Sequence, residues 1–353
     1  MAFGNFATKI KAVVTDLTSA DMTNINSAIF VDTFGVSSFA DAHTFVPARH
    51  GSLLPLINDD TDFNAFNTST GRTCAMTSET LTEKYDSKKW ELTEVGGRYG
   101  ICLKTLEEDF LVFWNTHKIV KEDPTSEPEW SDYIEFLTNK AKRNLSAAHW
   151  RVGYLGDKSV TANAKINGLN GFFTQASAGG GIKQTIEFAG VAPTGLEIYN
   201  GLKSAYETAS ETAWFSEDKV VIKMTKKMAQ TLVNYLNNLS DTSEYDVAVI
   251  LPAEAVKSRK YSVNGLHIFG VKVEAHQEID LSMDVVANSN KYQAVIAKKS
   301  NLLVGSPEVD KLEQFDMFYD QKDGQIYVDV LGYFGVAIAT DEYVYIDSEK
   351  DAG

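Results

Sequence analysis

The stretch DGQIYVDVLGYFGVAIAT, from Asp323 to Thr340, decides the fold because its apolar residues alternate along it. One side of this stretch carries Ile326, Val328, Val330, Gly332, Phe334, Val336 and Ile338. Strict alternation with a period of two is typical of a β-strand that buries one side. A transmembrane helix needs about 20 apolar residues, and Asp329 interrupts this run. We therefore predict a strand roughly 43 Å long, at about 3.3 Å per residue, with a bend at Gly332 or Gly335.

The residues on either side of this strand predict its neighbours. The preceding segment QFDMFYDQKDGQIYVDV contains Asp323–Gly324, a strong turn dipeptide between two β-like runs. We therefore predict a β-hairpin that closes at this turn. QAVIAKKSNLLVG predicts two more strands upstream, and EYVYI (Glu342–Ile346) predicts a last strand downstream.

Length and charge limit the class of protein. A chain of 353 residues exceeds what one compact core normally holds, which leaves two domains or one elongated subunit. The formal net charge is -15, and no run of basic residues occurs. A protein that holds nucleic acid by neutralising phosphates needs clustered Lys and Arg. The composition therefore excludes tight binding of this kind.

Cysteine usage and the first residues indicate the compartment. Cys74 and Cys102 are too few for a disulfide framework, and neither has a CxxC partner. The beginning, MAFGNFATKIKAVV, lacks the apolar core of a signal peptide. We therefore expect two reduced cysteines in a protein that is made in the cytoplasm.

The first 107 residues predict extended structures. Residues 1–70 are polar, with scattered aromatic residues and no lasting period, which is typical of an arm that docks onto another surface. Residues 71–107 contain two β-like runs around TEKYDSKKWELTE and predict an exposed hairpin. In its polar middle Trp90 stands between lysines and glutamates, a pattern that predicts an exposed contact site. The alternative is an exposed tryptophan on a mobile hairpin.

A long helix follows. Ser126 and Glu129 have the spacing of a capping box, with Pro128 in the first turn. Apolar residues then recur every three or four positions at Trp130, Ile134, Leu137, Ala141, Leu145, Ala148, Val152 and Leu155. We predict one helix from Ser126 to about Gly156, roughly 40 Å long.

The region from 160 to 304 mixes helices and short strands. GLEIYNGLKSAYETA and TKKMAQTLVNYLNNL predict amphipathic helices, and VVIK, VAVILP and LHIFGVKVE predict strands. Interleaved elements of this kind predict an α+β or α/β domain.

The sequence contains no complete catalytic, cofactor-binding or metal-binding motif. GVAPTGLE has the glycine spacing of a phosphate loop, but Leu196 and Glu197 occupy the positions that need Lys and Ser or Thr. The glycines of SAGGG have no GxGxxG frame, the six histidines have no metal spacing, and no GxSxG is present. The aspartates near the 323–324 turn lack the order of a calcium loop. We therefore predict no catalytic residue, no metal and no cofactor.

Three segments in this order resemble the major capsid proteins of tailed double-stranded-DNA bacteriophages, which have the Hong Kong 97 fold. INGLNGFF is similar to the glycine turn that follows the long helix in that family, and LHIFGVKVE to a strand that ends in a turn containing Phe-Gly. FDMFYDQKDGQIYVDVLGYFGVAIA resembles the hairpin near the end of the chain. The resemblance covers most of the sequence from Gly71 onward.

This resemblance implies an α+β fold with six consecutive parts: an N-terminal arm (1–70), an extended β-hairpin loop (71–107), a peripheral domain with a long spine helix (108–159), a mixed α/β axial domain (160–304), the long peripheral-domain strands (305–341) and a terminal strand with a tail (342–353). It explains the opening stretch, because a subunit that meets several neighbours in a shell needs long elements with apolar faces.

The resemblance also implies a function. A structural capsid protein would assemble with itself into hexamers and pentamers and form an icosahedral head around phage double-stranded DNA, without sequence-specific DNA binding. Its further partners would be portal and scaffolding proteins and a decoration protein, with no membrane; it would be assembled in the host cytoplasm and end in the virion capsid. The alternatives are the shell of an encapsulin-type nanocompartment, and an α/β enzyme or ligand-binding protein with an unrecognised site.

Aromatic residues supply the candidates for subunit contacts. They make up 11% of the chain and contribute strongly to interfaces. We expect Trp90, Tyr99, Phe34 and Phe39 at the interface between subunits.

Overall fold

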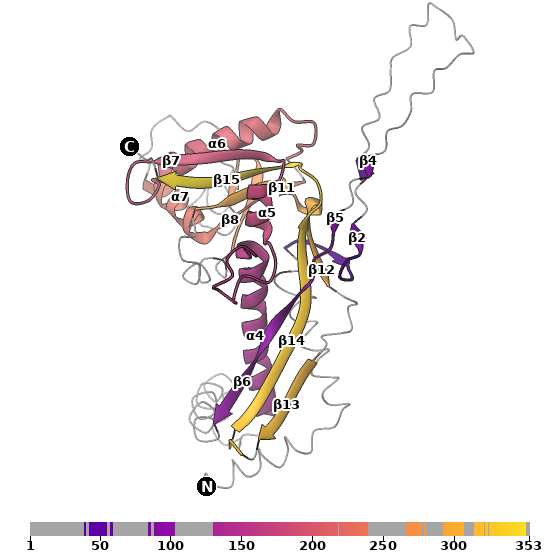
Figure 1. Ribbon diagram of the computed structural model, residues 1–353. Helices are drawn as coiled ribbons and strands as arrows, with labels where there is room; N and C mark the ends of the chain where they lie inside the picture. Colours follow the sequence, from indigo (N-terminus) through magenta and orange to yellow (C-terminus); the bar gives the residue numbers. More distant parts are fainter. Residues whose placement is uncertain are drawn as a thin grey trace, which may run out of the picture.

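The computed structural model describes residues 39, 42–54, 57–58, 84–85, 88–102, 130–217, 219–238, 266–276, 279, 292–306, 314–320, 322–323 and 325–350. These residues form an elongated α+β molecule (Figure 1). We call the part built on a five-stranded sheet the arm, and the part built on a six-stranded sheet the head.

The arm is organised around β14 (Gln325–Ile338), the long strand that the alternation predicts. All seven residues assigned to its inner side are buried, from Ile326 to Ile338. The strand runs through both of its glycines without interruption (Figure 1). β13 (Gln314–Asp320) pairs antiparallel with β14, so the hairpin predicted to close near residues 323–324 is confirmed.

Three further strands complete the arm sheet. β6 (Thr93–Cys102) pairs antiparallel with β14. β12 (Leu302–Ser306) also pairs antiparallel with β14, at its last residues, and β1 (Thr44–Pro47) adds to β12 in parallel. The arm sheet therefore joins two segments from the first 102 residues with three segments that follow residue 301.

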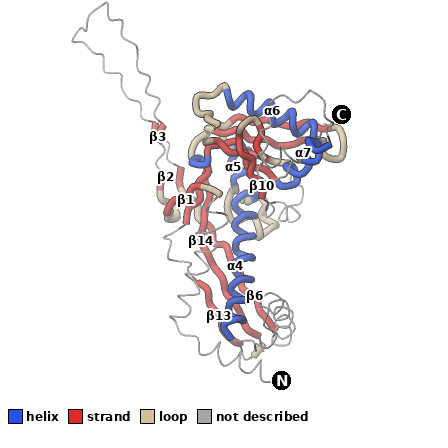
Figure 2. The backbone as a smooth tube through the Cα atoms, turned by 180° about the vertical axis from the view of Figure 1, so that it is seen from behind, coloured by secondary structure: helices blue, strands red, loops and turns tan. Residues whose placement is uncertain are grey.

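The long helix α4 (Trp130–Leu155) lies along one face of the arm sheet (Figures 1 and 2). The predicted helix is confirmed from its Trp130 onward, whereas residues 126–129 lie outside the described part of the chain. Near its C-terminal end Leu145, Ala148 and Val152 are buried, as the apolar stripe predicts.

The head sheet has the strand order β7, β15, β11, β8, β10, β9. The bounds are β7 (Ile182–Phe188), β15 (Tyr343–Lys350), β11 (Ala294–Lys298), β8 (Val220–Thr225), β10 (Val271–His276) and β9 (His267–Ile268). β15 lies between β11 and β7, so the predicted last strand belongs to the head. VAVILP, predicted as a strand over 247–252, lies outside the described residues.

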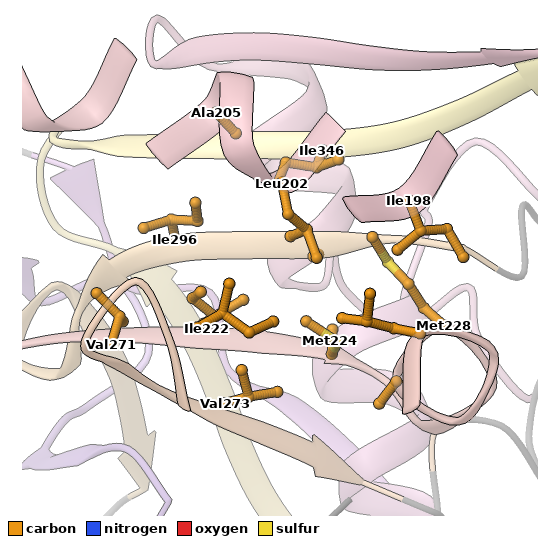
Figure 3. Close-up of a cluster of buried hydrophobic side chains, with 14 of the residues drawn as sticks. Ile198, Leu202, Ala205, Ile222, Met224, Met228, Val271, Val273, Ile296 and Ile346 are labelled. Atoms are coloured by element: carbon orange, nitrogen blue, oxygen red, sulfur yellow. The ribbon is translucent and has the colours of Figure 1, made fainter. Parts of the chain in front are cut away.

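Two amphipathic helices, α6 (Gly195–Ser210) and α7 (Lys226–Asn238), cover the head sheet. Their apolar sides and the facing strands form one core (Figure 3). Its central members are Ile198, Leu202, Ile222, Met224, Met228, Val273, Ile296 and Ile346. Burial of this apolar surface is the main source of stability of the head.

The segment LHIFGVKVE differs from the predicted single strand. It forms β9 and β10, which pair antiparallel across a two-residue turn at Phe269 and Gly270. Both residues have positive φ angles, 52° and 81°. Such turns match the right-handed twist of the paired strands, which explains the glycine at the second position.

A short two-stranded ribbon corrects the hairpin predicted within 71–107. β2 (Leu53–Leu54) pairs with β5 (Lys88–Lys89), and β3 (Ile57–Asn58) pairs with β4 (Lys84–Tyr85). The partners of residues 84–89 therefore come from upstream, while β6 joins the arm sheet. β6 pairs with β14 over ten residues, from Thr93 to Cys102, whereas each pairing of the ribbon spans two residues.

Candidate assembly interface

The described residues contain no arrangement typical of an active site. No group of three or more His, Cys, Asp or Glu side chains among them is placed to hold a metal ion. In the same residues no helix is long and apolar enough to cross a membrane.

The two glycine-containing motifs have structural roles. Thr194 is the N-cap of α6, where its hydroxyl accepts from the Glu197 backbone N–H at 3.3 Å and the Glu197 carboxylate accepts from the Thr194 backbone N–H at 2.6 Å. This capping box explains why a glutamate stands at the position where a phosphate loop has Ser or Thr. In SAGGG, a side chain on Gly181 would clash with the ring of Tyr343, so the glycine allows close packing.

A buried ion pair lies on the head sheet. Lys223 of β8 is fully buried and binds the carboxylate of Glu274, the residue opposite it on β10. Burial alone would raise the pKa of Glu274, but the ammonium groups of Lys223 and Lys272 outweigh it and lower the pKa to about 2. Burial lowers the pKa of Lys223, which Glu274 opposes. The Lys223 ammonium also donates to the carbonyl of Ala42 at 2.6 Å, so the pair holds the upstream segment against the head.

That upstream segment, residues 42–48, is called the strap below. His43 is 3% exposed, and its ring stacks on Phe172 with centroids 5.0 Å apart. His43 Nδ1 donates to the carbonyl of Phe39 at 2.6 Å, and Nε2 accepts from the hydroxyl of Tyr154 at 2.7 Å. The carbonyl accepts only, which assigns the proton of neutral His43 to Nδ1. The strap is thus bound to the arm helix α4 as well as to the head.

Phe39 corrects the expectation for the first 70 residues. Its side chain is fully buried in this chain and contacts the rings of Trp150 and Phe334, at 5.0 and 6.0 Å between centroids. A side chain on Gly153 of α4 would clash with the Phe39 ring. Phe39, His43 and Ala48 are therefore buried within their own subunit, and Phe39 leaves no surface for a neighbour. The N-terminal arm predicted over residues 1–70 therefore does not include Phe39. Its contact with other subunits stays a prediction for the residues before Phe39.

Trp90 is also a core residue, which corrects the prediction of an exposed contact. It is 3% exposed and packs with Ala48, Leu54 and Leu303. A side chain on Gly305 of β12 would lie 2.7 Å from its ring. Its backbone N–H donates to the carbonyl of Ser52 at 2.9 Å. Trp90 therefore anchors the base of the β2–β5 ribbon to the arm sheet.

The other two predicted contact residues are Tyr99 and Phe34. Tyr99 lies in β6 opposite Val328 of β14. Phe34 lies outside the described residues. The interface role of Tyr99 and Phe34 stays a prediction.

The outward face of the arm sheet carries an arginine over two stacked aromatic rings. Arg98 of β6 forms two hydrogen bonds of 2.6 Å with the carboxylate of Asp329. Its guanidinium lies 5.3 Å from the ring centroid of Phe318 and 5.8 Å from that of Tyr327. The Arg98 side chain is 60% exposed. Arginine and aromatic residues are enriched in protein interfaces, so this face, directed away from α4, is a candidate contact surface.

Exposed apolar side chains mark two further positions. Val191 is completely exposed in the loop between β7 and α6, and Leu196 is 48% exposed in the first turn of α6. Leu53 of β2 is 57% exposed. The segment AGVAPTGL (189–196), which contains Val191 and Leu196, has no charged residue. This uncharged segment is the feature of the sequence that could have indicated the exposed apolar position.

Solved structures share this architecture at low sequence identity. A chain in the structure described as "Satellite phage P4 procapsid including size determination (Sid) protein" is 11% identical, with a TM-score of 0.55 over 93% of this chain and 91% of that one. A chain of Gordonia phage Cozz is 10% identical, with a TM-score of 0.53 over 88% and 86%. A weaker likeness, with a TM-score of 0.44 and 12% identity over 92% and 98%, is to a virus-like particle from Pyrococcus furiosus.

No protein-family model matches the sequence, and no curated protein matches it either. The likeness therefore rests on the fold and extends over nearly the whole chain. The chain has the fold of phage major capsid proteins.

Proposed function

We propose that this chain is the structural major capsid protein of a tailed phage, which assembles into hexamers and pentamers of an icosahedral head around double-stranded DNA. The observation that carries this proposal is the likeness in fold to a procapsid chain over 93% of the sequence. We infer a structural role without catalysis from the same likeness.

The shape of the molecule supports self-assembly. The arm sheet is covered by α4 on one face (Figure 2). Its outward face carries Arg98, Phe318 and Tyr327. A second copy of the chain could cover this face. The net charge of -15 supports loose contact with DNA, because an inner wall that bound phosphates tightly would hinder packaging and release.

The parts of the structure can be assigned to the parts of the Hong Kong 97 fold. In this proposal the head is the axial domain, the arm is the peripheral domain, and α4 is the spine helix. The β2–β5 ribbon is the base of the extended loop, so that loop begins upstream of residue 71. Phe39 and the strap pack against their own subunit, so in this proposal the N-terminal arm consists of the residues before Phe39.

The proposed partners follow from the same assignment. They are other copies of this chain, a portal protein, a scaffolding protein, a decoration protein and packaged DNA bound without sequence specificity. The proposed location is the virion capsid, after assembly in the cytoplasm of the host.

Particle formation is the direct test. The full chain is purified from producing cells and analysed by sedimentation and electron microscopy. Closed particles far larger than the 38.9 kDa subunit are expected. A chain that stays at subunit size, with or without its scaffolding protein, would contradict the proposal and favour an enzyme or ligand-binding protein. Particles that contain a protein cargo in place of DNA would instead indicate a nanocompartment of the encapsulin type.

A further inference from the structure

Two of the passages of the chain between the head and the arm lie at one corner. β11 of the head ends at Lys298, and η3 (Lys299–Asn301) leads into β12 of the arm. β14 of the arm ends at Ile338, and residues 339–342 lead into β15 of the head. The two crossings lie next to each other, because the N–H of Ala339 donates to the carbonyl of Asn301 at 3.0 Å.

The side chain of Asn301 binds the two crossings together. It is 4% exposed, and its Nδ2 donates to the carbonyls of Thr340 and Glu342, each at 3.0 Å. Its Oδ1 accepts from the backbone N–H of Thr340 at 2.7 Å and from the Thr340 hydroxyl at 3.2 Å. The side-chain amide of Asn301 therefore pairs with three backbone groups of residues 339–342.

A second amide connects the corner to α5 (Phe172–Ala178). Gln175 Nε2 donates to the carbonyl of Val336 at 2.9 Å, and its Oε1 accepts from the N–H of Ile338 at 3.1 Å. Gln175 therefore pairs with the end of β14 in the way that a neighbouring strand would. The next residue, Ala176, accepts from the hydroxyl of Tyr343 in β15 at 3.1 Å. Consecutive residues of α5 thus bind the arm and the head.

Directional bonds of this kind specify one geometry. Apolar side chains can slide over one another and keep most of their contacts, because the hydrophobic effect is non-directional. Hydrogen bonds weaken steeply with misalignment, and a buried backbone group that loses its partner is costly. A change in the angle between head and arm would leave buried N–H and carbonyl groups at this corner unpaired.

We propose that this corner is a positioning element that fixes the angle between head and arm, and thereby the curvature at which copies of the chain assemble. The inference rests on the proposed function as a shell subunit. In a closed shell many copies of the same subunit make similar contacts, so a change of angle within the subunit changes the size or closure of the whole particle. Asn301 and Gln175 are the positioning residues.

The test compares particle diameters of corner variants with those of a matched control. Asn301→Ala and Gln175→Ala remove the two amides. Gln293→Ala is the control, because Gln293 is also partly buried and donates to the hydroxyl of Tyr345 at 2.8 Å, but this bond lies within the head. Each full-length chain is produced under the conditions that give wild-type particles. Electron microscopy gives the diameter distribution, and hydrogen exchange follows the amides of Ile338 and Thr340.

We expect both corner variants to form particles with a shifted or broadened diameter distribution and faster exchange at these amides. The control should keep the wild-type distribution. Wild-type diameters in corner variants whose amides exchange faster would overturn the inference, and so would an equal shift in the control. If Asn301→Ala does not fold, Gln175→Ala decides by the same criteria. A wild-type chain that forms no particles would contradict the proposed function itself, which separates the two failures.

Discussion

His149 should make the stability of the subunit depend on pH in the mildly acidic range. It lies in α4, is fully buried, and its ring centroid is 4.6 Å from that of Phe334. Burial lowers its pKa from 6.5 to about 3. The folded protein therefore holds the neutral imidazole, while the unfolded chain binds a proton at a higher pH.

The magnitude follows from these two pKa values. The contribution to the free energy of unfolding is complete above pH 6.5 and is lost progressively as the pH falls from 6.5 towards 3, because the unfolded state binds the proton first. Between pH 7.5 and 5.5 the expected loss is about 1.4 kcal/mol. Glu274 contributes little over this interval, because its pKa of about 2 and its ordinary value of 4.5 both lie below it.

Urea unfolding of the subunit at about pH 7.5 and about pH 5.5, followed by circular dichroism, measures this difference. The lower value stays above the isoelectric point of 4.9, where loss of charge favours aggregation. His149→Phe keeps a ring and removes the titration, so most of the pH dependence should disappear. His50→Gln alters an exposed histidine and should retain it. An undiminished loss of stability in His149→Phe would refute the reasoning.

Three further substitutions test the described contacts by the same unfolding measurement. Trp90→Ala should lower the free energy of unfolding by about 3–5 kcal/mol, as for other buried tryptophans. A loss below about 1 kcal/mol would contradict the burial of Trp90. Lys223→Met should cost about 3 kcal/mol by leaving Glu274 without its buried partner, and adding Glu274→Met should recover most of this loss. Arg98→Ala should change stability by less than about 1 kcal/mol but lower the yield of particles in sedimentation; an unchanged yield would exclude the outward face as a contact.

The elements with a strong local period could be predicted from the sequence. β14 was identifiable because alternate residues from Ile326 to Ile338 are apolar, and α4 because its stripe recurs every three or four residues. The capping box of α6 was also readable, since Thr194 and Glu197 have its spacing. Each of these patterns depends on residues that are close together in the chain.

The contacts that form the candidate surfaces could not be predicted in this way. Phe39 and Trp90 are buried because Gly153 and Gly305, far away in the sequence, leave room for their rings. A glycine within a helix lowers the stability of the helix by about 1 kcal/mol relative to alanine. Gly153 therefore indicated that another group packs closely against α4. The sequence alone could not identify this group as the ring of Phe39. The β2–β5 ribbon could not be predicted, because strands of two residues are too short to show an alternation of apolar and polar residues.

The strap has a consequence for the order of folding. Thr44 of the strap donates to the carbonyl of Lys299, a residue 255 positions later, and β1 pairs with β12. At roughly 5–20 residues per second, this stretch takes roughly 13–50 s to synthesise. During that time Phe39 has left the ribosome, but the strands that enclose it do not yet exist. The arm can close only when nearly the whole described chain has been made, so incomplete chains lack the finished subunit that assembly requires.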